Sequence, residues 1–250
     1  MRKTRVYTKS VLAVNTIVTL HDEAAHHLGN VLKARSGDSV ILFNGTGGSF
    51  DGEILSVERK AITIRLLHFN PTDNESPLTL TLAQGISRGQ HMDYTVQKAV
   101  ELGVTRIVPL FTEFSNVRLE EDRARKRREH WEKIITAACE QSGRNRLPEL
   151  YDAMPVDEWV RTESTSLRLL MHPESGQGLA DLTRNAGDIT LLCGPEGGLS
   201  QKEIEYSLTC GYLKVSVGPR ILRTETAAVA AIAVCQALLG DMMYNQPPQE

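Results

Sequence analysis

Two patterns of hydrophobic and polar positions divide the 250-residue chain. Up to about residue 67, short runs of β-forming residues alternate with turn signals, as where the run 40–43 meets the glycine-rich stretch 44–48. From residue 78 onwards, apolar runs of strand length alternate with stretches in which apolar residues recur every three or four positions. The first pattern predicts a small β-barrel, and the second predicts a mostly parallel α/β sheet.

Turn and cap residues set the bounds of the expected elements. In the first part we expect strands at 40–43, 50–55 and 61–67 and one short helix at 24–32. The polar stretch 70–77, with two prolines, is expected to be a linker between a domain at 1–72 and a domain at 73–250. The second domain is expected to hold strands 78–83, 107–110, 167–171, 189–193 and 213–217 and helices 92–102, 123–141, 200–211 and 225–239. Ser200 and Glu203 predict a capping box.

Composition and charge narrow the class of protein. Hydrophobic residues make up 41% and charged residues 24%, which predicts an ordinary globular protein rather than a disordered one. The net charge of −3 hides an asymmetry: residues 1–72 carry nine Lys/Arg against six Asp/Glu, and residues 73–250 carry nineteen against twenty-five. A basic N-terminal part on an acidic body fits a protein that holds nucleic acid with one part and does chemistry with the other, although three charges are also a chance excess.

The cysteines and the N-terminus bear on the compartment. The four cysteines are widely spaced, which predicts buried reduced thiols rather than disulfides or a zinc site. No metal is expected, since no group of residues has the spacing of metal ligands. The N-terminus is basic but no apolar signal region follows it, so a cytoplasmic protein is expected.

Three strand ends carry the residues expected to do chemistry. They are the stretches 170–173, 192–198 and 217–226, and ligands of open parallel sheets bind beyond the carboxyl ends of the strands. Glycines at 194, 197 and 198 permit close approach of the backbone to a ligand. Neither a dinucleotide fingerprint nor a phosphate loop is present, and Glu196 would repel a pyrophosphate but tolerate a cation such as a sulfonium. The alternative for each glycine stretch is a tight turn without a ligand.

Two of these stretches resemble a known family. Gly-Pro-Glu-Gly-Gly at 194–198, together with Arg-Ile-Leu-Arg-Thr-Glu-Thr-Ala at 220–227, resembles the RsmE-type 16S ribosomal RNA methyltransferases of the SPOUT class, which make 3-methyluridine. Weaker matches at 26–33, 97–103 and 138–144 extend the resemblance over nearly the whole chain. Lys33 departs from the pattern, where arginine is more usual, and lysine keeps the charge but lacks the bidentate fork.

The resemblance implies an architecture and partners. A PUA-like barrel at 1–72 would bind RNA, and a SPOUT domain with a C-terminal trefoil knot at 73–250 would use S-adenosylmethionine to methylate N3 of a uridine in 16S ribosomal RNA, within the small ribosomal subunit. It also implies a homodimer, with which the small-residue run 226–233 agrees, although such a run also suits a helix buried within one subunit. Two other functions stay open: a non-catalytic RNA-binding or assembly factor with this fold, and a nucleotide-dependent α/β enzyme of another class, such as a reductase.

Specific residues follow from the loops and the resemblance. Arg223 is expected to stabilise the uracil anion, and Glu225 either acts as the base or caps the following helix. The residues expected at the cofactor are Leu170, His172, Gly194, Glu196, Gly198, Val217, Leu222 and Thr224. The residues expected at the RNA are Arg2, Arg5, Lys33, Arg35, Arg88 and Lys98. The basic stretch 123–128 is flanked by acids and is expected to be a solvated helix face.

Overall fold

The chain folds into two compact units. The computed structural model describes residues 4–26, 28–29, 32–115, 121–175, 177–182 and 187–243. By their internal contacts, residues 1–75 and 139–147 form the N-terminal unit, and residues 76–138 and 148–250 form the C-terminal unit. This division differs from the expected one at 72, because a short segment from the middle of the chain packs with the N-terminal unit.

The N-terminal unit is built on a mixed five-stranded sheet in the order β1-β3-β4-β5-β2. Only the pair β1–β3 is parallel. The elements of residues 4–70 are β1 (Thr4–Tyr7), β2 (Ile17–His21), α1 (Asp22–His26), β3 (Ser39–Phe43), β4 (Ser49–Val57) and β5 (Ala61–Asn70). The expected strands at 40–43, 50–55 and 61–67 are confirmed; of the helix expected at 24–32, α1 begins earlier, at Asp22, and residues 28–29 are also helical. Parts of that range lie outside the described residues.

Alternation along the strands decides which face of this sheet forms the core. In β2 every second residue is buried, so Val18 and Leu20 point inward while their neighbours are exposed. In β5 the buried positions are Ile62, Ile64 and Leu66, again with a period of two. Successive side chains of a strand point to opposite faces, and only one face of this sheet is therefore covered.

An ion pair and two further hydrogen bonds hold residues 139–147 in the N-terminal unit. The guanidinium of Arg144 is buried, and its Nε lies 3.0 Å and 3.2 Å from the two carboxylate oxygens of Glu75. Arg5 donates to Oδ1 of Asn145 at 2.6 Å, and the backbone N–H of Tyr7 donates to the carboxylate of Glu140 at 2.9 Å. The stretch 70–77 is irregular after its first residue, as expected of a linker, but it is pinned by these contacts at Glu75.

The C-terminal unit is built on a seven-stranded, wholly parallel sheet. Its order is β12-β10-β11-β6-β7-β8, with β9 paired to β7. The strands are β6 (Thr79–Gly85), β7 (Arg106–Phe111), β8 (Glu149–Leu150), β9 (Met154–Pro155), β10 (Leu167–Met171), β11 (Asp188–Cys193) and β12 (Leu213–Val215). The parallel sheet expected from the alternating pattern is confirmed.

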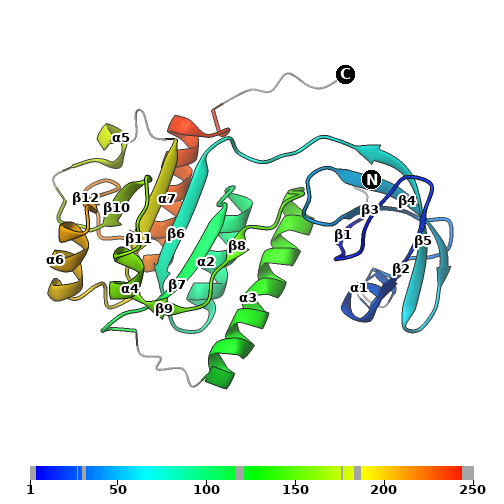
Figure 1. The fold of residues 1–250 in the computed structure, drawn as a ribbon, viewed down its shortest axis with the longest axis horizontal. Helices are drawn as coiled ribbons and strands as arrows, with labels where there is room; N and C mark the ends of the chain where they lie inside the picture. The colour runs from blue at the N-terminus through cyan, green and yellow to red at the C-terminus, as the bar shows by residue number, and fades with distance from the viewer. Residues whose placement is uncertain are drawn as a thin grey trace. The chain divides into compact units, whose positions relative to one another are not determined.

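Helices cover both faces of this sheet (Figure 1). α2 and α7 pack against each other, and α7 also contacts β6 and β11 on the same face. α4 and α6 lie on the other face, where Val156 and Ile204 share a hydrophobic core with Leu170 and Leu192 of the sheet. The helices of this part are α2 (Gln90–Glu101), α3 (Glu121–Ser142), α4 (Val156–Val160), α5 (Leu179–Leu182), α6 (Gln201–Thr209) and α7 (Thr224–Leu239). Burial on both faces explains why the central strands are continuous apolar runs.

Most elements expected in this part of the chain are confirmed. The capping box is present, since the Ser200 side chain accepts from the backbone of Glu203 and the Glu203 carboxylate accepts from the backbone of Ser200. Elements β8, β9, α4 and α5 were not expected, because two to five residues are too few to show a period. The four cysteines are free thiols, three of them buried, as expected. Over the described residues, no helix has both the length and the apolar character needed to cross a membrane.

The buried ion pair generates a stability prediction. Replacing Arg144 with methionine should lower the free energy of unfolding by up to about 3–5 kcal/mol, because the carboxylate of Glu75, only 17% exposed, would lose its charged partner. Arg146→Met is the matched control, since Arg146 is 53% exposed and its ion pair with Asp73, at 2.8 Å, is worth less than about 1 kcal/mol. Urea unfolding followed by circular dichroism measures both. Equal losses in the two variants would contradict the prediction.

Candidate functional site

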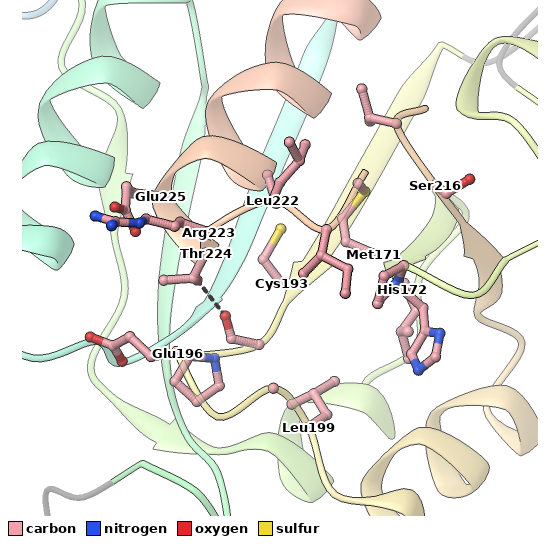
Figure 2. Close-up of a pocket in the computed structure, with 18 of the residues that line it drawn as sticks. Met171, His172, Cys193, Glu196, Leu199, Ser216, Leu222, Arg223, Thr224 and Glu225 are labelled. Carbon is pink, nitrogen blue, oxygen red and sulfur yellow. Dashed lines mark hydrogen bonds between the residues drawn. The ribbon is translucent and has the colours of Figure 1, made fainter. Parts of the chain in front are cut away.

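A pocket of about 600 Å³ opens at the carboxyl ends of three neighbouring strands of the C-terminal unit. The loops after β10, β11 and β12 form its walls, and the first turn of α7 closes one side (Figure 2). Its lining consists of residues 170–173, 193–199, 216–218 and 220–225, with His91, Ile204 and Ala227. Parallel strands bring their carboxyl ends to one edge of a sheet, so loops far apart in the sequence meet here.

Glycines shape the loop after β11. A side chain at Gly194 would lie 2.8 Å from the backbone carbon of Gly198, so the loop folds back on itself only without one. Gly198 has a φ of +72°, and a side chain placed on it would meet no atom within 4 Å. The open space beside Gly198 is the pocket, which Gly198 lines. The loop therefore presents its backbone directly to the cavity.

A hydrogen bond ties this loop to α7. The buried hydroxyl of Thr224 donates to the carbonyl oxygen of Gly194 at 2.6 Å (Figure 2). Thr224 is the first residue of α7, and Arg223 before it is the N-cap. The Thr224 bond thus fixes where the N-terminus of the helix meets the glycine loop.

Two charged residues at this end of α7 face the pocket. Arg223 is exposed, and no described residue forms a hydrogen bond or ion pair with its guanidinium. Glu225 is only 12% exposed, and its Oε1 lies 3.1 Å from Nδ1 of His91, which is 45% exposed at the start of α2. The carboxylate of Glu225 therefore has a specific partner besides the positive end of its own helix.

Glu196 and Cys193 complete the chemistry of the lining. The carboxylate of Glu196 accepts a hydrogen bond of 2.8 Å from the backbone N–H of Arg88, which brings the loop after β6 to the pocket rim.

Burial raises the pKa of the Cys193 thiol to about 12, and the nearby Cys235 thiol adds to the shift. Cys193 is therefore a neutral apolar wall of the pocket rather than a nucleophile.

All ten residues expected to bind the cofactor or to act in catalysis line this one pocket. These are Leu170, His172, Gly194, Glu196, Gly198, Val217, Leu222, Arg223, Thr224 and Glu225. Their roles are not tested by this placement. Among the described residues, no group of three or more His, Cys, Asp or Glu side chains is arranged to hold a metal.

The residues expected to bind RNA are placed in different surroundings. Lys33 and Arg35 of the N-terminal unit and Arg88 of the C-terminal unit are exposed, while Lys98 is half-buried and paired with Glu101 at 2.8 Å. Arg5 is half-buried, with its guanidinium bonded to Asn145 and 5.0 Å from the ring centre of Phe43. Its contacts are those of a structural residue. Arg2 lies outside the described residues.

Sequence reasoning missed the contribution of a fourth strand end. β6 pairs with β11 in the sheet, and the segment after it delivers His91 to the pocket. The signal was present, because β6 was expected and its carboxyl end must lie beside that of β11. Nothing in the sequence showed that His91 and Glu225, 134 positions apart, are partners.

Comparison with known proteins agrees with the fold. The family described as "RNA methyltransferase domain" matches residues 74–236, and the family described as "RNA methyltransferase PUA domain" matches residues 20–67. A ribosomal RNA small subunit methyltransferase E of Buchnera aphidicola is 36% identical over 239 residues, covering 95% of this chain and 97% of its own. The chain belongs to the ribosomal RNA small subunit methyltransferase E family.

Solved structures extend this likeness to the whole chain. The methyltransferase E of Neisseria gonorrhoeae, bound to S-adenosylmethionine, is 40% identical with a TM-score of 0.93, covering 96% of this chain and 99% of its own. A methyltransferase of Legionella pneumophila, in complex with S-adenosylmethionine, is 39% identical with a TM-score of 0.92, covering 97% and 100%. The expected fold class is confirmed: a SPOUT-type α/β domain with a parallel sheet, preceded by a PUA domain. The trefoil knot stays a prediction.

Proposed function

We propose that this protein uses S-adenosylmethionine to methylate N3 of a uridine in 16S ribosomal RNA. The observation that carries the proposal is the pocket at the ends of β10, β11 and β12. The first turn of α7 forms one side of this pocket, and Arg223 and Glu225 stand at that end of the helix. Its methyl donor is suggested by the family's solved members, two of which hold S-adenosylmethionine. Its RNA is suggested by the names of the relatives.

The lining of the pocket fits this methyl donor. A cavity of about 600 Å³ lies within the range of roughly 300–1,000 Å³ usual for small-molecule sites. Leu170, Val217 and Leu222 give apolar walls, and the backbone around Gly198 is open to hydrogen bonds. Glu196 on the rim suits a ligand with a positive charge. When bound, S-adenosylmethionine supplies an electrophilic methyl group.

The residues at the start of α7 suit the acceptor. Methylation at N3 of uracil requires loss of the N3 proton, and the negative charge then spreads over the ring oxygens and N3. Arg223 is positioned to hold that charge through its planar, positively charged guanidinium. Glu225 accepts the proton at its carboxylate, which lines the pocket and lies 3.1 Å from Nδ1 of His91.

The N-terminal unit contributes to holding the RNA. Lys33 and Arg35 are exposed cations on this unit and are the candidates for phosphate contacts, whereas Arg5 is engaged within the unit. N3 lies on the Watson–Crick edge, so the target uridine must be unpaired or flipped out. Folded RNA presents mainly shape and phosphates to such a surface. An assembled small subunit is the substrate we expect.

Mapping of methylated nucleosides tests the proposed function directly. The purified protein is incubated with S-adenosylmethionine and small ribosomal subunits lacking the modification, and the 16S RNA is digested and analysed by mass spectrometry. The proposal expects one new 3-methyluridine at one site. Methylation at another atom would retain the enzyme class but overturn the assignment to N3, and no methylation would overturn the function.

Gly198 provides a test of the cofactor site. Gly198→Val should abolish saturable S-adenosylmethionine binding in calorimetry, because the side chain would project into the pocket from a backbone with φ of +72°. Gly211→Val is the matched control, since Gly211 also has a positive φ of +88° with open space beside it but does not line the pocket. Loss of binding in both variants would show that backbone strain, not occupation of the pocket, is responsible.

Arg223 provides a test of charge stabilisation. Arg223→Ala should bind the cofactor nearly normally and lose ~100- to 1,000-fold in single-turnover rate, because its contact strengthens as N3 loses its proton. Arg223→Lys should recover part of the rate, since a point charge replaces a planar fork. An unchanged single-turnover rate with weaker RNA binding would make Arg223 a phosphate anchor instead.

We also propose a homodimer formed partly by the region of α7. Ile221, just before the helix, is 87% exposed, and Leu238 near its end is also exposed. Large apolar side chains in such positions favour a protein partner. Light scattering should give about twice the chain mass of 27.7 kDa. A monomer with full methyltransferase activity would contradict this proposal.

A further inference from the structure

Gln84 is a buried polar residue next to the pocket that does not line it. It lies one residue before the end of β6 and is fully buried. In the sheet it pairs with Cys193 of β11 on one side and Pro109 of β7 on the other. A fully buried amide must find hydrogen bonds, since leaving a buried polar group unpaired is costly.

The side-chain amide of Gln84 reaches three segments of the chain. Its Nε2 lies 3.0 Å from the carbonyl oxygen of Gly85, 3.1 Å from that of Gly194 and 3.1 Å from Oγ1 of Thr224. Thr224 in turn donates to Gly194 at 2.6 Å, so its oxygen is available to accept from Gln84. The three residues close a small hydrogen-bonded ring that joins β6, the loop after β11 and the start of α7.

The neighbours of the amide fix its orientation. Exchanging nitrogen and oxygen would place Oε1 against two carbonyl oxygens and a hydroxyl that already donates elsewhere. None of these would supply a proton to it, so the orientation with Nε2 toward the ring is the one that makes these hydrogen bonds. In this orientation Oε1 of Gln84 is buried and has no hydrogen-bond partner among the described residues. Gln84 therefore acts here as a donor.

The backbone around the ring leaves little room for adjustment. A side chain at Gly85 would lie 2.5 Å from Cδ of Pro195 and 2.7 Å from its nitrogen. The end of β6 and the loop after β11 are thus in direct backbone contact. Removing the amide leaves the carbonyl of Gly194 and the hydroxyl of Thr224 held only by each other.

We propose that Gln84 is a positioning residue for methyl transfer. Its amide sets the distance between the Gly194 loop, which faces the methyl donor, and the start of α7. Because Thr224 lies between Arg223 and Glu225, the same contact places both of those side chains relative to the methyl group. This inference rests on the proposed function. Gln84 touches neither substrate and acts only through Gly194 and Thr224.

Gln84→Met tests this role against a control of equal burial. Methionine keeps the length of the side chain but donates no hydrogen bond. We expect a loss of ~10- to 100-fold in single-turnover rate at saturating cofactor and RNA, the size of effect that a small misplacement of reacting groups produces. Affinity for S-adenosylmethionine should fall by a smaller factor. Gln236→Met is the control. Gln236 is equally buried, lies in α7 twelve residues beyond Thr224, and accepts its hydrogen bond from Ser76 instead of contacting the ring.

Gln84→Glu should make the rate of methyl transfer depend on pH, which a purely structural role of Gln84 would not predict. A protonated carboxyl still donates one hydrogen bond to the ring, whereas an ionised carboxylate would face the carbonyl oxygens of Gly85 and Gly194. Burial favours the protonated form, so ionisation is expected between about pH 6 and pH 9. The rate of this variant relative to the wild type should fall as the pH rises through that range. This variant also keeps the test valid if Gln84→Met does not fold.

Hydrogen exchange separates failure of this inference from failure of the proposed function. Amides of residues 194–199 and 221–227 should exchange faster in Gln84→Met than in Gln236→Met, measured without RNA. If the wild type methylates no RNA, the proposed function fails while this measurement still decides whether Gln84 orders both segments. Equal rates of methyl transfer in Gln84→Met and the wild type, or equal losses in both methionine variants, would overturn the positioning role.

Discussion

The active end of the C-terminal unit depends on close backbone contact between β6 and the loop that follows β11. Gly85 and Pro195 touch through main-chain and ring atoms, with no room for a side chain between them. Gly194 repeats this constraint within the loop itself, where a side chain would lie 2.8 Å from the backbone carbon of Gly198. Because the strands are parallel, their carboxyl ends lie at the same edge, and only glycine at these positions lets the loops meet. The pocket exists as a consequence of that packing.

α7 connects this edge to the rest of the unit and is held by a buried glutamine near each end. At its start, Thr224 bonds Gln84 and Gly194, and near its end Gln236 accepts a hydrogen bond of 2.6 Å from Ser76. The apolar residues between them pack on the sheet and on α2. A helix held in this way is a rigid support for the two charged side chains at its N-terminus. Pre-organised charges cost no rearrangement when the reaction develops charge of the opposite sign.

The two units solve different physical problems. The N-terminal unit covers one face of a small mixed sheet and adds the ion pair between the buried Arg144 and Glu75, which holds the segment 139–147 in this unit. The C-terminal unit buries both faces of a parallel sheet and leaves one edge for chemistry. Lys33 and Arg35 are exposed on the first unit and the pocket lies in the second, so the proposed tasks of holding RNA and modifying it fall on different units.

The sequence by itself determined the class of the fold and three of the four strand ends that contribute residues to the pocket. Strand length, helical period and cap residues predicted most elements. Glycines and charged residues after three apolar strands indicated the loops that form the pocket, and all ten residues expected there line it. Partnerships across the chain were decided only by the tertiary structure. The Glu225–His91 pair, the ring of Gln84, Gly194 and Thr224, and the role of Arg5 within its own unit join residues far apart in sequence. Periodicity reports which face of an element is buried, but hydrogen bonds depend on how whole elements are placed, to within a few tenths of an ångström.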